Sequence, residues 1–569
     1  MARTVIASEA KQSSRYVVDR APNEALNSAS LDQASALDCR VASLLAMTDA
    51  TGRKHTLSEP ISRRFVIVGG GTAGWLAAFV LADAAKRKAL PIQLTVVESS
   101  KIPTIGVGEG TTAAFRMLLK NLGIDEMEFI RETEATIKFG IRHQNWRGDG
   151  KHYDGPIDDP HQVVRAPPGA PSDFLNVYSV AAGKPLADMH LFGPLMAKDR
   201  SPYAARKDGS LLPLGPFHYA YHFDQALVGK FLKRKSVGVA VIDALVEAVE
   251  RDASTGDIAA LKLDTGARLE GDFFIDATGF RRRLIGEAMG AKFVSYADSL
   301  PVNRAMPFWL DIGEGEEIAP VTLAHALDSG WMWKIPTQKR YGCGYVYSDA
   351  HQTPEGAKRE IEALLGCAIE VRNDIKLNVG RLDEAWIGNC LGLGLASSFL
   401  EPLEATSIHG TVVQLLLFAG RFLKAGANDA AERADYNARI GRQIDDFRSF
   451  INLHYCGGRS DTAFWRDFAA NRVHDETRAR LESWTRTMPQ REQFSSFLDG
   501  LPHVESQLYY PVLDGLGRLD RRLAQAEMEA APKLRDFARA TYGELRREYA
   551  GAAAQAVGHA AFLAMAREG

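Results

Sequence analysis

Residues 65–98 read FVIVGGGTAGWLAAFVLADAAKRKALPIQLTVVE, and this stretch decides the fold. A β-branched run at 65–68 leads into a glycine-rich turn at 69–74. Residues 75–86 then repeat apolar side chains at helical spacing, and a second apolar run at 94–97 is closed by Glu98. The order strand, glycine turn, helix, strand and acid predicts a βαβ unit that binds a dinucleotide.

Each glycine of the turn has a separate physical task. Gly69 permits the tight bend, Gly71 lets the backbone approach a pyrophosphate, and Gly74 lets the helix pack closely on the strand. The helix N-terminus offers free N–H groups and a positive dipole end to the phosphates. A carboxylate at Glu98 suits ribose hydroxyls and argues against a 2′-phosphate. The predicted nucleotide contacts in this unit are Gly69, Gly71, Thr72, Ala73, Gly74, Trp75 and Glu98.

Composition excludes several other classes of protein. The chain has 569 residues with a formal net charge of -3, which gives no support for a nucleic-acid binder. No apolar run is long enough for a membrane span. The five cysteines are widely spaced without a CxxC pair, so we expect neither a metal site nor a disulfide framework. A reducing, cytoplasmic setting is the simplest expectation.

The pattern changes along the chain. Residues 1–60 lack a sustained period and are interpreted either as a disordered leader or as translated upstream DNA with Met47 the true start. Residues 61–425 are expected to form a nucleotide-binding domain with interleaved strands, and 426–569 a mostly helical region. An apolar helix is predicted at 408–424, and an amphipathic helical tail at 518–567 either forms a dimer interface or packs on the core.

The nucleotide is expected to be FAD. Short strands predicted at 239–242, 244–251, 258–263 and 268–275 suggest an inserted β-meander, and the segment FIDATG at 274–279 looks like the second nucleotide-contacting segment of FAD-dependent monooxygenases. Only one good dinucleotide unit is found, which also favours a flavin over a nicotinamide cofactor. The predicted class is α/β: an FAD-binding Rossmann domain of the glutathione-reductase or monooxygenase type, with a helical C-terminal substrate region.

Four motifs give the chain a resemblance to a known family. From about residue 63 to at least 517 it resembles flavin-dependent halogenases of the tryptophan halogenase family. The motifs are GGGTAGW at 69–75, IGVGEG at 105–110 (IGVGEA in the family), GWMWKIP at 330–336 (WxWxIP) and SSFLEPLEAT at 397–406 (FLEPLEST).

The resemblance implies a division of labour between two sites. A separate flavin reductase would supply reduced FAD, which with oxygen and bromide or chloride would give hypohalous acid beside the flavin. This oxidant would travel through the protein to Lys138, next to an electron-rich, indole-type aromatic substrate. Glu404 would be the partner carboxylate.

Ordinary chemistry is consistent with both assignments. A buried ammonium can hydrogen-bond hypohalite and raise its electrophilicity, or form a haloamine if desolvation lowers its pKa. A carboxylate beside the ring can stabilise the cationic intermediate and remove its proton. Without the family, Lys138 would be interpreted as a solvated helix lysine and Glu404 as a charge favoured at a helix N-terminus.

The resemblance also implies the halide and remaining flavin contacts. Thr406 and Ser407 open an apolar helix whose N–H groups can face an anion. Trp331 and Trp333 would line the region between flavin and substrate, or simply fill the core. The further FAD contacts are Leu395 and Ile408 near the flavin ring and Ser99, Ile102, Gly110 and Val246 toward the nucleotide, with core packing as the alternative for the apolar ones.

The chain departs from the family at the site and at the substrate lid. Ala405 replaces the usual serine and Ser407 the usual glycine. The segment between residues 489 and 509 is short and lacks the aromatic cluster that grips free tryptophan, which favours an indole without its amino-acid tail, a phenol, a pyrrole or a larger natural product. The remaining aromatic candidates are Phe494, Phe497, Tyr509 and Tyr510 as pocket walls or helix packing, and His152 and Tyr153 near the pocket or on a surface loop.

Two other functions stay open. The first is an aromatic hydroxylase that oxygenates its substrate directly at the flavin and needs no halide. The second is a flavoprotein that has lost turnover, and the departures from the family at Ala405 and Ser407 are compatible with it.

Overall fold

The computed structural model describes residues 62–102, 108–494, 504 and 506–568. The interpretations of residues 1–60, including Met47, lie outside the described residues, as do the first half of the IGVGEG motif and Phe497. Within the described residues, no helix is both long and apolar enough to cross a membrane.

A six-stranded sheet confirms the predicted βαβ unit. Its strand order is β10-β2-β1-β14-β23-β22, parallel except for the antiparallel edge pair β22–β23. Strand β1 (Arg63–Val68) leads through the glycine turn into α3 (Thr72–Arg87), and β2 (Ile92–Glu98) follows. The core of β1 is fully buried, as expected for a parallel strand covered on both faces. The other strands are β10 (Ala240–Asp243), β14 (Phe273–Asp276), β22 (Trp386–Ile387) and β23 (Cys390–Gly392).

The predicted meander is partly wrong. A separate three-stranded sheet holds only β11 (Val246–Arg251), β12 (Ile258–Leu263) and β13 (Arg268–Glu270). The run predicted at 239–242 becomes β10. The run at 268–275 divides near Asp272, whose carboxylate accepts hydrogen bonds from Arg64 of β1. The apolar half that follows, β14, is buried between β1 and β23 in the central sheet.

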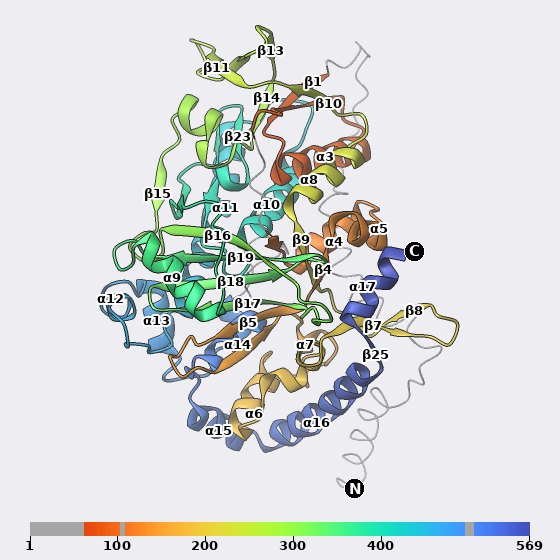
Figure 1. Ribbon diagram of the computed structural model, residues 1–569, viewed down its shortest axis with the longest axis vertical. Helices are drawn as coiled ribbons and strands as arrows, with labels where there is room; N and C mark the ends of the chain where they lie inside the picture. Colours follow the sequence, from red (N-terminus) through yellow and green to blue (C-terminus); the bar gives the residue numbers. More distant parts are fainter. Residues whose placement is uncertain (1–61, 103–107, 495–503, 505, 569) are drawn as a thin grey trace.

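A seven-stranded sheet lies below the nucleotide-binding region (Figure 1), in the order β20-β16-β19-β18-β17-β5-β6. The GWMWKIP motif is its strand β18 (Gly330–Pro336). A small sheet, β3-β9-β4, contacts it through β3 and β4. The strands are β3 (Gly108–Gly110), β4 (Thr136–Lys138), β5 (Gly140–Gln144), β6 (His152–Pro156), β9 (Ala220–Asp224), β16 (Arg304–Asp311), β17 (Val321–Ala326), β19 (Arg340–Tyr347) and β20 (Ile375–Lys376).

The C-terminal part is mostly helical and packs on the rest of the chain. Helices α15 and α16 lie against α6 at the end of the molecule farthest from the central sheet (Figure 1). Strand β25 (Ala556–Gly558) pairs with β7 (Arg200–Ala205). Packing on the core therefore accounts for the amphipathic tail. The helices are α10 (Thr406–Leu417), α11 (Ala430–His454), α12 (Ala463–Asn471), α13 (Asp475–Ser483), α14 (Ser506–Gly515), α15 (Arg521–Ala530), α16 (Pro532–Gln555) and α17 (His559–Glu568).

The remaining elements connect these layers. They are the helices α4 (Ala113–Asn121), α5 (Glu126–Thr133), α6 (Phe174–Ala182), α7 (Phe192–Ala197), α8 (Gln225–Lys235) and α9 (Pro354–Leu365), and the strands β8 (Leu211–Pro213), β15 (Phe293–Ser295), β21 (Gly380–Leu382) and β24 (Ser398–Phe399).

Candidate functional site

Lys138 lies inside the protein at the end of β4. Its side chain is buried, and its ammonium nitrogen donates a hydrogen bond to the Thr111 carbonyl at 3.0 Å. Burial lowers the pKa of Lys138 to about 8, although the charge of Glu404 opposes this. The strand is held from the far end of the chain, because the Ile137 N–H donates to His559 Nε2 at 3.1 Å. His559 Nδ1 in turn donates to the Ile318 carbonyl at 2.7 Å.

Glu404 lies in a tight turn just before α10. Both Glu404 and Ala405 have left-handed backbone angles, with φ of 62° and 53°. Such angles cost non-glycine residues roughly 1–3 kcal/mol each and are often retained at functional sites. Burial raises the pKa of Glu404, but its interactions with His143 and His454 outweigh burial and hold that pKa at about 2. The carboxylate is therefore ionised at neutral pH.

The two predicted catalytic side chains share one cavity. It has a volume of about 20 Å³, which is room for roughly one water-sized molecule. An amine and a carboxylate that face one small space can bind a small oxidant and receive a proton next to it. The lining residues are Gly110, Lys138, Ile141, Thr322, Ala324, Trp331, Ile335, Pro402, Leu403, Glu404 and Ala405.

Of the two motif tryptophans, only Trp331 lines this cavity. Its indole N–H donates to Glu401 Oε2 at 2.7 Å, and the Tyr455 hydroxyl donates to the same oxygen at 2.5 Å. Burial raises the pKa of Glu401 to about 7. Trp333 packs flat against the backbone of Gly344, where a Cβ would approach its ring to 2.1 Å. Glu401 was not predicted, and it fixes the indole that forms one wall of the cavity.

The predicted halide residues begin α10, directly after Glu404. The N-cap, Ala405, makes no side-chain cap, so the first N–H groups of the helix are not satisfied in that way. Thr406 is buried and Ser407 is partly buried. Ile408 is buried one residue later, which fits either of its predicted interpretations.

The glycine turn has the predicted shape. A Cβ on Gly69 would lie 2.2 Å from the Ala277 carbonyl oxygen, and one on Gly74 would lie 1.8 Å from the Gly69 carbonyl oxygen. A Cβ on Gly71 would meet nothing within 4 Å, although it stands at the uncapped N-terminus of α3. Packing therefore requires Gly69 and Gly74, whereas Gly71 borders open space suited to a pyrophosphate.

Glu98 ends β2 beside this turn. It accepts hydrogen bonds from Trp75 Nε1 at 2.9 Å and from Lys233 Nζ at 2.5 Å. Both bonds hold the carboxylate at the carboxyl end of the parallel sheet, where nucleotides bind in this class of fold. Thr72 is buried, and its hydroxyl donates to the Gln225 carbonyl at 3.4 Å.

The other predicted flavin contacts are spread over several places. Gly394, next to Leu395, would bring a Cβ to 2.9 Å from that of Ala73, so this segment lies at the α3 N-terminus. Gly110 instead lies beside Lys138, where a Cβ would be 3.3 Å from Nζ. The rest are Ser99, partly buried after β2, Ile102, which is 62% exposed, and Val246, partly buried at the start of β11.

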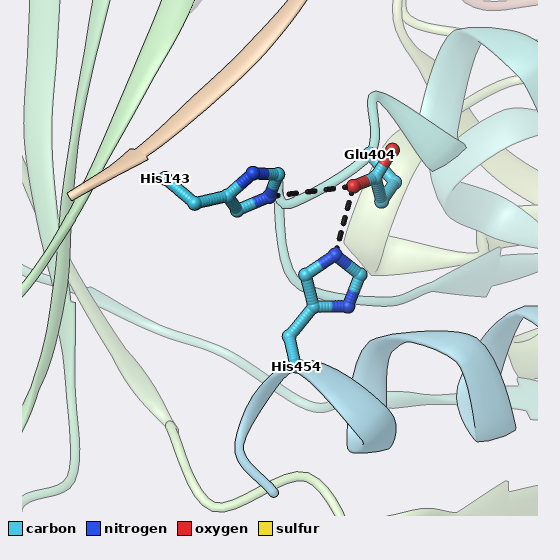
Figure 2. Close-up of side chains that lie close together, drawn as sticks. All are labelled: His143, Glu404 and His454. Atoms are coloured by element: carbon cyan, nitrogen blue, oxygen red, sulfur yellow. Dashed lines mark hydrogen bonds and ion pairs between the residues drawn. The ribbon is translucent and has the colours of Figure 1, made fainter. Parts of the chain in front are cut away.

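Two histidines that the sequence analysis missed contact Glu404 (Figure 2). Oε1 of Glu404 is 2.9 Å from His454 Nε2 and 3.6 Å from His143 Nε2. His143 stacks on Tyr153 with ring centroids 4.7 Å apart. The surface-loop interpretation of Tyr153 is therefore wrong, because Tyr153 belongs to β6 and packs inward, whereas its neighbour His152 is exposed.

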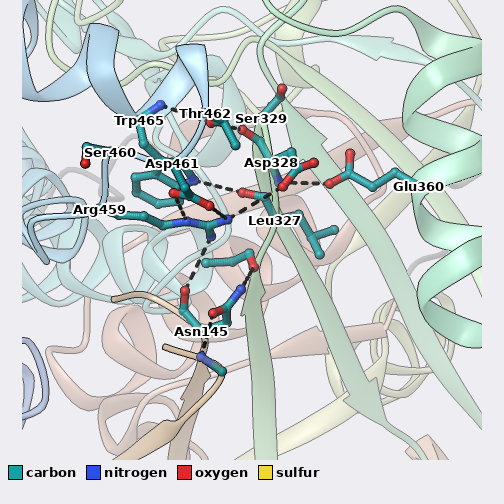
Figure 3. A network of polar contacts seen from close by, with 12 residues as sticks. Asn145, Leu327, Asp328, Ser329, Glu360, Arg459, Ser460, Asp461, Thr462 and Trp465 are labelled. Atoms are coloured by element: carbon teal, nitrogen blue, oxygen red, sulfur yellow. Dashed lines mark hydrogen bonds and ion pairs between the residues drawn. The ribbon is translucent and has the colours of Figure 1, made fainter. Parts of the chain in front are cut away.

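A polar network ties the segments that carry these histidines together (Figure 3). The buried guanidinium of Arg459, just after α11, pairs with Asp461 at 2.7 Å and donates to the Asn145 carbonyl at 3.4 Å, just after β5. Trp465 Nε1 donates to the Leu327 carbonyl at 2.9 Å. The end of α11 is thus fixed against β5, which explains how residues distant in sequence meet at Glu404.

The lid aromatics in the described part of the chain serve as packing between helices. Tyr509 stacks near Phe450 and Phe494, with centroids 4.6 and 4.5 Å away. The Tyr510 hydroxyl donates to the Pro489 carbonyl at 2.6 Å. Neither tyrosine lines the cavity that holds Lys138 and Glu404.

Comparison with known proteins agrees with this geometry. A family model described as tryptophan halogenase matches residues 64–530. The chain is 34% identical over 520 residues to the tryptophan 6-halogenase SttH of Streptomyces toxytricini, covering 85% of this chain and 97% of the relative. Among solved structures it is similar to a tryptophan C-6 flavin-dependent halogenase from taromycin biosynthesis, at 33% identity and a TM-score of 0.79 over 89% of this chain and all (100%) of that one.

A second solved structure extends the likeness beyond halogenases named for tryptophan. BrvH, a flavin-dependent halogenase from Brevundimonas sp. BAL3, is 30% identical with a TM-score of 0.77, covering 89% of this chain and 100% of that one. The family resemblance carried by the four sequence motifs is thus confirmed over most of the chain. The chain belongs to the tryptophan halogenase family and is a flavin-dependent halogenase.

Proposed function

We propose that this enzyme halogenates an electron-rich, indole-type aromatic ring, using reduced FAD from a separate reductase, oxygen, and bromide or chloride. The observation that supports this most is the shared cavity of Lys138 and Glu404. The cavity is too small for an aromatic ring, and it marks the place where the amine and the carboxylate meet. The substrate ring would therefore approach from beside it.

The two side chains would divide the chemistry at the ring. Lys138 holds hypohalous acid by hydrogen bonding, with one of its three N–H donors already placed on the Thr111 carbonyl. The ring carbon takes the halogen, and the hydroxide that leaves takes a proton from the Lys138 ammonium and departs as water. The proton that Glu404 accepts from the ring balances the one that Lys138 gives up. Glu404, ionised at neutral pH, stabilises the cationic ring and accepts the proton that its carbon loses.

The residues of the glycine turn fit FAD as the flavin. The uncapped α3 N-terminus and the open space at Gly71 suit a pyrophosphate, and Glu98 suits ribose hydroxyls. When bound, FAD supplies the activation of oxygen that turns halide into hypohalous acid. The first N–H groups of α10, at Thr406 and Ser407, are the proposed halide contacts.

A product assay tests this function directly. The enzyme is supplied with FAD, an NADH-driven flavin reductase, oxygen and either bromide or chloride, together with indoles, phenols, pyrroles and free tryptophan. We expect a mass shift for halogen in place of hydrogen on an indole that lacks the amino-acid tail. A hydroxylated product formed without halide would instead establish the hydroxylase, and the absence of any product across the panel would contradict the proposal.

A pair of glycine substitutions tests the cofactor assignment. Gly74→Ala forces a Cβ to 1.8 Å from a carbonyl oxygen, so we expect it to lower the free energy of unfolding by about 1–3 kcal/mol. In Gly71→Ala the new Cβ has no protein atom within 4 Å, so the free energy of unfolding should stay within about 0.5 kcal/mol of the parent. FAD affinity should nevertheless fall at least tenfold, by roughly 1.4 kcal/mol. Urea unfolding and flavin fluorescence titration measure the two effects. Unchanged FAD affinity in Gly71→Ala would contradict the assignment of the pyrophosphate to this turn.

A further inference from the structure

His143, Glu404 and His454 form a compact cluster of potential metal ligands (Figure 2). One ligand atom from each residue lies within 4.8 Å of the other two. The three residues come from strand β5, from the turn before α10 and from the last turn of α11. Both imidazole rings point at the same carboxylate oxygen, so the donors converge from separate elements.

The hydrogen bonds within the cluster do not satisfy the ring nitrogens of His143. The side chain is 1% exposed, yet neither ring nitrogen makes a hydrogen bond within the described residues. Its Nε2 stands 3.6 Å from Glu404 Oε1, beyond hydrogen-bonding distance, and Tyr153 stacked on the ring fixes that direction. At this distance Nε2 and the carboxylate are within ion-pair range without a hydrogen bond. A buried ring nitrogen without a hydrogen bond costs free energy, and an ion bound at Nε2 would recover the share of that nitrogen.

His454 has the outer contact typical of a metal-ligating histidine. Its Nδ1 faces the Phe450 carbonyl at 2.9 Å, and a ring nitrogen facing a carbonyl oxygen must carry the proton. Its Nε2 donates to the ionised Glu404 carboxylate at 2.9 Å, so a metal that binds at Nε2 takes the place of the proton on this nitrogen. A backbone carbonyl on the far nitrogen is a common device that orients histidine ligands.

We propose that His143, Glu404 and His454 bind a divalent first-row transition metal ion such as Zn²⁺, and that a bound ion inhibits the enzyme. Two imidazoles and one carboxylate suit Zn²⁺, Co²⁺ and their neighbours and are poor ligands for Mg²⁺ or Ca²⁺. Three protein ligands leave at least one position open on the metal. Glu404 also lines the cavity with Lys138, so the ion has access from that side.

Inhibition rests on the proposed role of Glu404. A carboxylate bound to a cation can neither accept the ring proton nor stabilise positive charge on the ring. No metal site was expected from the sequence, because cysteine spacing and close-set ligand motifs give no sign of one. These three ligands are far apart in the chain and meet only through the fold.

Direct binding is measured first, on the full chain without an affinity tag. We expect about one equivalent of Zn²⁺ to bind in equilibrium dialysis with elemental analysis, and Co²⁺ to give visible absorption bands of a protein-bound ion. His143→Ala and His454→Ala should each weaken binding at least tenfold. The matched controls are His152→Ala, an exposed histidine nearby, and Cys367→Ser, an exposed thiol, and both should bind like the parent.

Three outcomes would overturn the metal site. These are no stoichiometric Zn²⁺ binding by the parent, binding unaltered in both histidine variants, and Co²⁺ bands that persist in His143→Ala. Circular dichroism checks that each variant is folded. If His454→Ala fails to fold, then His143→Ala and the Co²⁺ spectrum of the parent decide, because the unbonded His143 holds no neighbouring backbone in place.

Inhibition is measured separately with chemically reduced FAD, so that a metal effect on the reductase does not enter. We expect Zn²⁺ to suppress halogenation at the concentrations that fill the site, and chelation by EDTA to restore it. Stoichiometric Zn²⁺ binding with undiminished turnover would support the metal site but contradict the proposed inhibition. It would also contradict the proposed catalytic role of Glu404. The failure of the proposed function and the failure of the metal site are thereby distinguishable.

Discussion

Lys138→Ala is expected to lower the rate of halogenation at least about 100-fold, the usual scale for a side chain that acts on the reacting group. Among the described residues the substitution removes the only ammonium that lines the cavity, and it leaves the oxidant without its hydrogen-bond donor. Hypohalous acid would then escape to solvent. The measurement is the rate of halogenated product at saturating FAD, together with the amount of free hypohalous acid trapped by an added thioether.

Two controls separate chemistry from folding in this experiment. Lys138→Met keeps most of the buried length without the charge, so it should fold at least as well as the parent and be as inactive as Lys138→Ala. Lys151→Ala removes an exposed lysine just before β6 and should leave the rate unchanged. Full activity in Lys138→Met would contradict the role of the amine.

The pH profile then distinguishes the two forms of amine chemistry. Because burial lowers the pKa of Lys138 to about 8, the amine loses its proton as the pH rises through that value. If the ammonium form polarises hypohalite, the rate falls above about pH 8. If the neutral amine forms a haloamine, the rate instead rises over the same interval. In either case, the change in rate near pH 8 should be absent from the residual activity of Lys138→Met.

Glu404→Gln is expected to lower the rate about 100-fold while leaving the capture of oxidant intact. The amide keeps the size of the side chain but neither accepts the ring proton nor offsets the cationic charge. Since His143 and His454 hold the pKa of Glu404 at about 2 against the effect of burial, the carboxylate stays ionised well below neutral pH. The parent should therefore show no acid limb from Glu404 above about pH 4.

The comparison variant for this experiment is Glu384→Gln, which alters an exposed glutamate and should behave like the parent. Rates measured with ring-deuterated substrate add a second readout. If Glu404 removes the ring proton, an isotope effect should appear or grow in Glu404→Gln because that step becomes slow. A substitution that lowers FAD affinity and turnover in parallel, without an isotope effect, would point to a structural role instead.

Local patterns in the sequence predict the nucleotide half of the protein well. The glycine turn and its flanking strands obey short-range rules, and the contacts of Gly69 and Gly74 show why those positions tolerate no side chain. The meander is less well predicted, because the run at 268–275 carries no signal that its second half would pair with β1. That pairing depends on residues roughly two hundred positions away, such as the Arg64–Asp272 bond.

The candidate site also combines residues that the sequence predicts with residues that only the fold brings together. Glu404 was predicted because it lies within a family motif, and Lys138 because the family resemblance aligns it with the family's lysine. His143 and His454 were missed because a single histidine in a strand or at the end of a long helix has no distinctive spacing. Only the packing of α11 against β5, fixed around Arg459, brings both rings to Glu404.

The hydrogen bond between Ile137 and His559 links a strand made early in synthesis to the last helix of the chain. During synthesis the βαβ unit emerges from the ribosome long before residue 559, so it can form while the strand that carries Lys138 still lacks its anchor. A product that ends before His559 would lack this hydrogen bond to the strand that carries Lys138. The last helix of the chain therefore completes the support of a strand that is made more than four hundred residues earlier.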